Sequence, residues 1–161
     1  MIKKNILFVC SGNVFRSMSA KYCLENFCKL NNIKNISCDS AGINVGKNKQ
    51  FIKEEVKQEL LKLGININSH KPKNVSEINL NKFDLIIAMG YNHKKFLKDK
   101  FNIDSVLFNK VCYDVNYPVY DNNEVLSYHK GFVGALYNVQ IVKYISKSIP
   151  FFTKNYINFL K

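Results

Sequence analysis

Apolar stretches alternate with helical patterns along the chain. The stretch at 5–10 is continuously apolar and rich in branched side chains, which is typical of a strand buried on both faces. A similar stretch at 83–89 predicts another buried strand, and a short strand at 36–41 is closed by Gly42. The residues at 105–108 predict a fourth strand, which is also short.

Helices are predicted between these strands. A stripe of apolar side chains predicts a helix over 16–31, and a second helix over 51–63 stops at Gly64, a suitable residue for the position after a helix end. A third helix follows Gly90 and runs to about residue 98. Residues 110–130 are polar and predict a long loop, whereas 132–160 are helical, with Pro150 kinking the helix or separating two helices.

This order of elements indicates an α/β fold. Strands that alternate with helices are joined by right-handed crossovers, which gives an open parallel sheet with helices on both faces. We therefore expect an open four-stranded parallel sheet. The 161 residues contain no linker or internal repeat, so one domain covering 1–161 is expected.

The charge and the apolar runs restrict the possible partners. The net charge is +12, but the lysines are spread along the whole chain without basic–aromatic alternation, so no nucleic-acid partner is expected. Apolar runs such as 85–89 are too short to span a bilayer. The apolar part of the first ten residues is also shorter than a secretory signal requires. We expect a cytoplasmic monomer that binds no membrane.

The cysteines and histidines do not form metal or disulfide patterns. There are five cysteines, an odd number, and none is spaced as a CxxC pair. The histidines, His70, His93 and His129, also lack the spacing of metal ligands. We therefore expect no disulfide framework, no metal and no cofactor. Of the three histidines, only His70 is expected near the functional site, where it would brace other residues.

One residue stands apart in this lysine-rich chain. Arg16 is the only arginine beside 23 lysines, and it follows Cys10 by six positions. A guanidinium is a planar fork of donors that can bind two oxygens of a phosphate, whereas an ammonium is a point charge. A cysteine and an arginine at this spacing are what a cysteine-dependent phosphate-monoester hydrolase requires.

The segment between Cys10 and Ser17 is predicted to connect the first strand to the first helix. In such a sheet, ligands bind at the carboxyl ends of strands and beside helix N-termini. Gly12 permits close approach of the backbone, and Asn13 is a residue type that tolerates the left-handed conformation. Backbone N–H groups there can form an anion-binding nest that favours the thiolate form of Cys10.

The same segment resembles the signature loop of the low-molecular-weight protein tyrosine phosphatases. Further similarity lies at 39–42, at 69–71 and at 83–89, so the resemblance covers most of the chain. It implies a Rossmann-like phosphatase fold with Cys10 as the nucleophile and Arg16 as the transition-state clamp. The implied phosphate-binding residues are Ser11, Gly12, Asn13, Val14, Phe15 and Ser17. Asn13 and Ser40 would brace the loop, and Ser17 would donate a hydrogen bond to the thiolate.

The chain departs from this family at several positions. Phe15 stands where members usually carry a second loop cysteine, and Met18 replaces the proline after the arginine–serine pair. Gly90 replaces an aspartate after the third strand. The loop after Gly42 is shorter than in the family, and the aromatic residue that often flanks the substrate there is not evident.

The general acid is not settled by the sequence. The family supplies it from an Asp-Pro pair before the last helix, and this chain has no Asp-Pro. Alignment favours Asp121 over Tyr117, and Asp114 is a further alternative, as is the loss of an efficient acid. The aromatic residues of this region, Tyr113, Tyr117, Tyr120 and Tyr128, either form the wall of a substrate cleft or pack on the C-terminal helices.

The sequence is compatible with three functions. The leading one is a protein tyrosine phosphatase that works through a cysteinyl-phosphate and acts on a tyrosine-phosphorylated protein. The resemblance suggests a bacterial tyrosine kinase as such a partner. The second is a thiol-dependent arsenate reductase, which needs further thiols, and Cys112 is the one that falls in the predicted loop. The third is a phosphoprotein-binding domain that has lost its proton donor.

Overall fold

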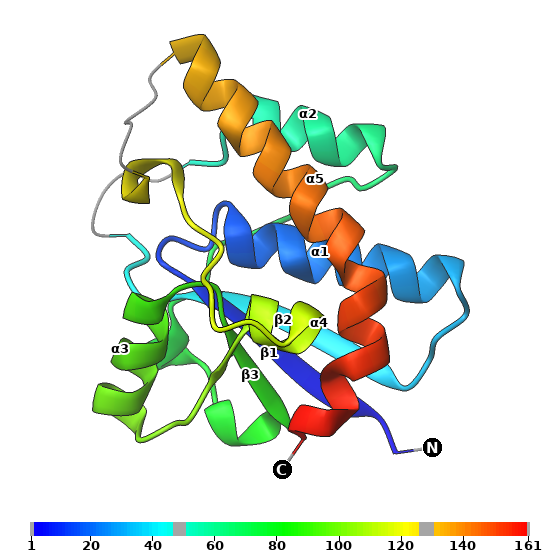
Figure 1. Ribbon diagram of the computed structural model, residues 1–161, viewed down its shortest axis with the longest axis vertical. Helices are drawn as coiled ribbons and strands as arrows, with labels where there is room; N and C mark the ends of the chain where they lie inside the picture. The colour runs from blue at the N-terminus through cyan, green and yellow to red at the C-terminus, as the bar shows by residue number, and fades with distance from the viewer. Residues whose placement is uncertain (1, 47–50, 126–130, 161) are drawn as a thin grey trace.

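The computed structural model describes residues 2–46, 51–125 and 131–160. Within these residues, four strands form one parallel sheet in the order β2-β1-β3-β4 (Figure 1). The strands are β1 (Lys4–Cys10), β2 (Ile36–Gly42), β3 (Leu85–Ala88) and β4 (Val106–Leu107). The predicted four-stranded parallel sheet is therefore confirmed.

Five helices and four short 3-10 turns surround this sheet in the described part of the chain. The helices are α1 (Arg16–Leu30), α2 (Glu54–Lys62), α3 (Tyr91–Phe101), α4 (Phe108–Tyr113) and α5 (Gly131–Asn155). The turns are η1 (Val75–Glu77), η2 (Leu80–Lys82), η3 (Asn122–Glu124) and η4 (Tyr156–Phe159). In Figure 1, α5 runs along one side of the molecule and packs across α1.

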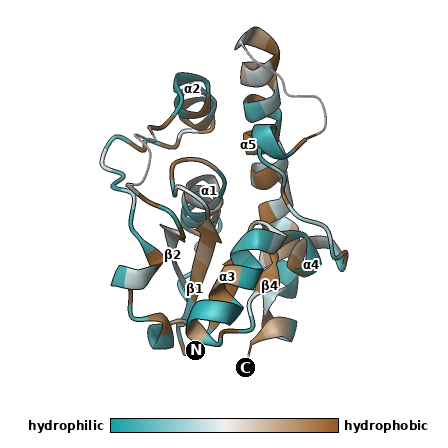
Figure 2. Cartoon of the chain, turned by 90° about the vertical axis from the view of Figure 1, so that its left-hand side faces the viewer, coloured by the Kyte–Doolittle hydropathy of each residue, from teal (hydrophilic) through white to brown (hydrophobic). Residues whose placement is uncertain are grey.

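The central strand β1 is covered on both faces, as its continuous apolar sequence predicted. Ile6 and Phe8 belong to a core cluster shared with α1 and α5. Leu7 and Val9 point the other way and pack with Leu97 of α3 and with the 3-10 turns. Figure 2 shows the apolar colouring of β1 in the interior of the fold. Helices on both faces of the sheet are thus confirmed.

The region after β3 differs from the sequence-based prediction. The strand predicted at 105–108 is only two residues long, and helix α4 occupies the start of the predicted loop. Phe108, Val111 and Cys112 explain the difference, because they recur at helical spacing and are all buried in the core shared with α5. Because polar residues surround these three positions in the sequence, the pattern of this short amphipathic helix is difficult to recognise.

Pro150 neither separates two helices nor ends one, since it lies inside the single helix α5. An interior proline costs a helix about 3 kcal/mol. Ile145, Ile149 and Phe152 are almost completely buried on the same helix. Burial of these side chains, at roughly 1.5–3 kcal/mol each, is sufficient to hold the helix together across the proline.

The sheet order places the functional loop. The chain runs from β1 to its neighbour β2 and then returns to β3 on the opposite side of β1. Cys10, the last residue of β1, pairs with Gly42 at the end of β2. Ligands bind in open parallel sheets at such a reversal, outside the carboxyl ends of the strands. The loop that follows Cys10 therefore lies where the topology favours a binding site.

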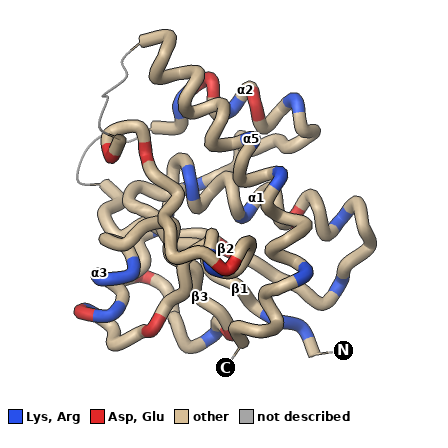
Figure 3. Tube along the Cα trace, in the orientation of Figure 1, with Lys and Arg blue, Asp and Glu red and all other residues tan. Residues whose placement is uncertain are grey.

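The basic residues are distributed over several elements. Figure 3 shows lysines on α1, on α3 and near the chain ends, without one continuous basic band on the face in view. Among the helices of the described residues, none combines the length and the apolar character that a membrane crossing needs.

Candidate active site

The loop of residues 10–17 connects the end of β1 to the first turn of α1. Helix α1 begins at Arg16 with Phe15 at its N-cap position, and no side chain of the described residues caps it. Its first turn also contains no acidic residue. The unpaired N–H groups and the positive end of the helix dipole are therefore free to bind an anion.

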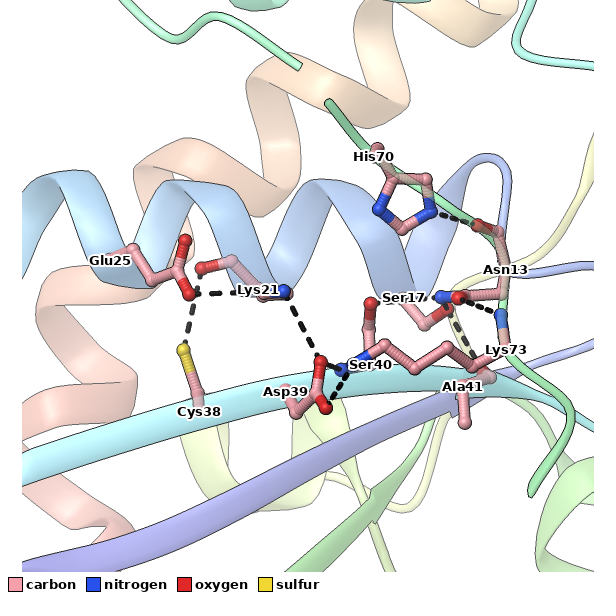
Figure 4. Close-up of polar contacts among 10 residues, drawn as sticks. All are labelled: Asn13, Ser17, Lys21, Glu25, Cys38, Asp39, Ser40, Ala41, His70 and Lys73. Carbon is pink, nitrogen blue, oxygen red and sulfur yellow. Dashed lines mark hydrogen bonds and ion pairs between the residues drawn. The ribbon is translucent and has the colours of Figure 1, made fainter. Parts of the chain in front are cut away.

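Asn13 shapes the loop through its backbone and its side chain. Its φ of 57° is left-handed, as expected for an asparagine at this position. Its side-chain amide donates to Ser40 Oγ at 2.9 Å and to Ser17 Oγ at 3.0 Å. The amide oxygen accepts from the backbone N–H of Lys73 at 3.0 Å (Figure 4). Asn13 thus ties the loop to β2 and to the segment after α2.

Ser17 lies next to the sulfur of Cys10. The Ser17 Oγ and Cys10 Sγ atoms are 2.9 Å apart, and Cys10 is 3% exposed. The Ser17 hydroxyl is also 3.2 Å from the carbonyl oxygen of Ala41. A thiolate has no hydrogen to give, so Ser17 must be the donor when Cys10 is ionised. The same hydroxyl also donates to the Ala41 carbonyl oxygen, so its single hydrogen is shared between that oxygen and the sulfur.

His70 braces the loop from the outside. Its Nε2 lies 2.7 Å from the carbonyl oxygen of Asn13, so this nitrogen carries the hydrogen and donates. Burial lowers the pKa of His70, and the ring packs edge-on against Tyr22. The sequence-based placement of His70 beside the loop agrees with this contact (Figure 4).

Arg16 is held almost completely inside the protein. The side chain donates through Nη1 to the carbonyl oxygen of Val119 at 2.8 Å and to Glu124 Oε2 at 2.9 Å. Its Nη2 lies 3.3 Å from Asp121 Oδ2. The Nε atom is buried and has no hydrogen-bond partner among the described residues. A buried donor without a partner is costly, and a bound oxyanion would satisfy it.

A cavity of about 460 Å³ opens over this loop. Four segments far apart in the sequence form its wall. The loop lines it together with residues before and at the start of α2, one residue of α3, and residues at η3. The lining residues are Cys10, Ser11, Gly12, Val14, Phe15, Arg16, Phe51, Lys53, Val56, Asn92, Asp121, Asn123 and Glu124. Asn13 and Ser17, also predicted to bind phosphate, are buried in the loop and support it.

Phe51 corrects two predictions. Helix α2 begins only at Glu54, so Phe51 lies before the helix and not in its apolar stripe. Its ring is 75% exposed and lines the cavity. An aromatic side chain is therefore present beside the site, although none was evident after Gly42. Only the fold reveals this, because the ring reaches the loop across space.

The three candidates for the general acid are well separated. Asp121 lines the cavity beside Arg16. Asp114 follows α4 in a left-handed conformation, and its side chain is 84% exposed and paired with Lys110. Tyr117 is also exposed and does not line the cavity. The geometry thus brings Asp121 alone of these three residues to the cysteine and the arginine.

The tyrosines of the same region do not line the cavity in the described residues. Tyr113 packs against Tyr144 and Phe151 of α5, as the packing alternative predicted. Tyr117 and Tyr120 contact each other edge to face, with ring centroids 5.4 Å apart. Two further residues considered above, Tyr128 and His129, lie outside the described residues.

Sequence reasoning missed several polar residues at the site, among them His93 and Glu124. His93 is completely buried, and its Nε2 lies 2.9 Å from Ser11 Oγ. Burial, and to a lesser extent the charge of Arg16, lowers the pKa of His93 to about 3. No pattern around His93 indicates this contact. Glu124 could have been found, because Asp121 and Glu124 have the spacing of a capping box.

Cys112 is not in a mobile loop, as the arsenate-reductase alternative required, but is buried in α4 at 2% exposure. All five cysteines are free thiols. Among the described residues, no group of three or more His, Cys, Asp or Glu side chains is arranged to hold a metal ion.

Known proteins share this sequence and fold. Residues 5–121 match the family model described as low molecular weight phosphotyrosine protein phosphatase. The low molecular weight protein-tyrosine-phosphatase Ptp of Acinetobacter johnsonii is 33% identical over 95 residues. This match covers 59% of the chain and 63% of the relative, which is less than two thirds of its length.

Solved structures show the same fold over nearly the whole chain. A low molecular weight protein tyrosine phosphatase from T. tengcongensis superposes with a TM-score of 0.77 at 24% identity, covering 94% of this chain and 99% of that one. The YwlE arginine phosphatase from Geobacillus stearothermophilus gives a TM-score of 0.77 at 19% identity, covering 96% and 94%.

Proposed function

Since the chain belongs to the low molecular weight phosphotyrosine protein phosphatase family, we propose that it hydrolyses phosphotyrosine in proteins through a cysteinyl-phosphate intermediate. One observation carries this proposal. Cys10, Arg16 and Asp121, from distant parts of the sequence, line one cavity at the N-terminus of α1, which no side chain of the described residues caps. A nucleophile, an oxyanion clamp and a proton donor are the three groups that the reaction needs.

In the first step, the thiolate of Cys10 attacks phosphorus from the floor of the cavity. An S–P bond forms as the P–O bond to the tyrosine breaks. For this step Asp121 must be protonated, with its contact to Arg16 exchanged for the phosphate. Asp121 then gives its proton to the departing phenolate, which would otherwise be a poor leaving group. The products are free tyrosine in the protein chain, phosphorylated Cys10 and an ionised Asp121.

In the second step, a water molecule attacks phosphorus and Asp121 takes its proton. The S–P bond breaks, inorganic phosphate forms and the thiolate of Cys10 returns. The Ser17 hydroxyl, 2.9 Å from sulfur, donates to the departing thiolate. This contact supports the role of Ser17, because a hydrogen bond to the charged form makes the thiolate a better leaving group.

Throughout both steps, Arg16 and the loop N–H groups stabilise negative charge on the equatorial phosphate oxygens. The unpartnered Nε of Arg16 supports this role, since it is a donor held ready before substrate arrives. A donor fixed in advance costs no reorganisation when the charge develops.

The alternatives receive less support. An arsenate reductase requires further thiols near the nucleophile, and burial of Cys112 in α4 does not supply one. A non-catalytic phosphoprotein-binding domain needs no acid, yet Asp121 lines the cavity beside Arg16. We assign the acid to Asp121 as part of the proposal.

The proposal extends to partner and compartment. A tyrosine-phosphorylated protein is the substrate, and a bacterial tyrosine kinase is the partner that the family suggests. The five free thiols fit a reducing compartment, so we place the protein in the cytoplasm. We propose a monomer as its working state.

Phosphate release from a tyrosine-phosphorylated peptide tests the function. Wild type should turn over, and Cys10→Ser should lose kcat by on the order of 10³-fold or more while still binding the peptide. A phosphoarginine peptide and arsenate are the comparison substrates, because an arginine phosphatase shares the fold. Preference for either of them, or undiminished turnover by Cys10→Ser, would contradict the proposal.

A further inference from the structure

One carboxylate oxygen of Glu124 accepts hydrogen bonds from both Arg16 and Asp121. Its Oε2 accepts from Nη1 of Arg16 at 2.9 Å and from the backbone N–H of Asp121 at 2.7 Å. The carboxylate therefore links the residue that we assign to the phosphate oxygens with the residue that we assign to the leaving group. Among the described residues, the direct contact between these two is longer, at 3.3 Å from Nη2 of Arg16 to Oδ2 of Asp121.

The contact to Arg16 fixes the guanidinium. The arginine side chain is 2% exposed, whereas that of Glu124 is 27% exposed, so the carboxylate holds the buried cation from the solvent side. Val119 binds the same Nη1 atom through its carbonyl oxygen. With Nη1 held twice, rotation of the guanidinium plane is restricted and Nε stays buried at the loop.

The contact to Asp121 fixes the acid. Asp121 is the N-cap of the 3-10 turn η3, and its side chain accepts from the N–H of Asn122 at 2.7 Å. Glu124 completes the capping box by reaching back to the N–H of Asp121. Together these hydrogen bonds restrict the backbone at Asp121 and so the position of its carboxyl group.

We propose that Glu124 is a positioning residue that holds Arg16 and Asp121 in the relative position that catalysis needs. The inference rests on the proposed function, because their relative position matters only if both residues serve one reaction. Its physical basis is the steep dependence of rate on geometry, since a misplacement of about 1 Å can cost on the order of 10²-fold.

Two conservative variants separate position from charge. Glu124→Gln removes the charge but keeps an oxygen at the distance of Oε2, so it can accept both hydrogen bonds. Glu124→Asp keeps the charge but is one methylene shorter, so the carboxylate no longer reaches. If Glu124 acts by positioning, Glu124→Asp should lower activity more than Glu124→Gln does. If its role is purely electrostatic, Glu124→Gln should lower activity more.

Turnover is the first readout. On a phosphotyrosine peptide we expect Glu124→Asp to lower kcat by about 10- to 100-fold and Glu124→Gln by less than about 5-fold. On p-nitrophenyl phosphate, which needs less proton assistance, the loss in Glu124→Asp should be several-fold smaller. Equal losses in the two variants, or a loss without dependence on the leaving group, would overturn the inference.

Glu77→Ala is the matched control. Glu77 is the third residue of η1, a 3-10 turn whose N-cap is Asn74, and so has the same place in its turn as Glu124 has in η3. It is exposed and does not line the cavity. We expect unchanged kinetics for Glu77→Ala, and a loss comparable to that of Glu124→Asp would mean that turn stability alone explains the effect.

Binding of inorganic phosphate, measured by titration calorimetry, is the second readout and needs no turnover. Glu124→Asp should weaken phosphate binding several-fold because Arg16 loses its restraint, and Glu124→Gln should not weaken it. Tighter binding in Glu124→Asp would overturn the inference. The three proteins could show the expected order of phosphate affinities while wild type releases no phosphate from phosphotyrosine. The proposed function would then fail, and the positioning of Arg16 by Glu124 would stand.

Discussion

At the scale of single residues, the site depends on groups that have no substitute nearby. Arg16 is the only arginine of the chain, and its guanidinium is bound by a carbonyl and two carboxylates while one donor stays free. Asp121 lines the cavity, whereas Asp114 is exposed and paired elsewhere. Each assignment can therefore be tested by one substitution and one matched control.

Arg16→Lys should lower kcat/KM by about 100-fold or more. An ammonium cannot bind two oxygens in a plane, and the loss of a bidentate contact in the transition state is worth several kcal/mol. Steady-state kinetics on a phosphotyrosine peptide measure the effect. Near-normal kinetics would show that the fork geometry of the guanidinium is dispensable.

Asp121→Asn should reduce the rate strongly for phosphotyrosine and less for an aryl phosphate with an acidic phenol. The reason is that a better leaving group needs less help from a proton donor. Asp114→Asn removes the same charge from a residue outside the cavity and should show no such dependence. If Asp114→Asn alone shows the dependence on the leaving group, Asp114 is the general acid. If neither variant shows it, the chain lacks an efficient general acid.

At the scale of elements, the ends of β1 and β2 lie in close contact beside the loop of residues 10–17. Gly42 pairs with Cys10, and a Cβ atom at Gly42 would lie 2.5 Å from the carbonyl oxygen of Ser11 and 3.0 Å from the backbone nitrogen of Asn13. Both of these neighbours are backbone atoms of the phosphate-binding loop. A glycine is therefore required for close approach of the two elements.

Gly42→Ala should displace the loop and lower kcat by about 10- to 100-fold, because geometry at the nucleophile sets the rate. Gly64→Ala is the control. Gly64 has a φ of 75° after α2 with open space around it, so its substitution costs stability without moving the loop. Activity and thermal unfolding of both variants separate the two effects. Equal kinetics for Gly42→Ala and wild type would show that the loop tolerates the methyl group.

At the scale of the whole molecule, burial of titratable groups connects stability to pH. His93 is completely buried against the loop, and its pKa is lowered to about 3 by burial and by the charge of Arg16. In the unfolded chain, a histidine titrates near 6.5. Between these two values the unfolded state binds more protons than the folded state, so stability rises with pH in that window.

Stability should thus be fully present above about pH 6.5 and fall as the pH drops toward 3. At pH 5 the contribution of His93 to this loss is roughly 2 kcal/mol, from about 1.5 pH units at 1.36 kcal/mol each. Urea unfolding of wild type and His93→Gln at pH 7.5 and pH 5 measures it. A pH dependence as steep in His93→Gln as in wild type would exclude this histidine as the cause.

The sequence by itself determined the features that depend on neighbouring residues. The apolar run of β1, the left-handed Asn13 and the start of α1 at Arg16 follow from local pattern and residue type, and all agree with the structure. The same local logic placed Cys10 at the end of a buried first strand, where parallel sheets bind ligands.

Only the tertiary structure decided what surrounds that loop. The contacts of Arg16 to Val119 and Glu124 span 103 and 108 residues of sequence, and Phe51 reaches the cavity from outside its expected helix. Pro150 stays inside α5 because core packing outweighs its local preference. Local propensity is a weak term, and it yields wherever burial and long-range hydrogen bonds supply more free energy.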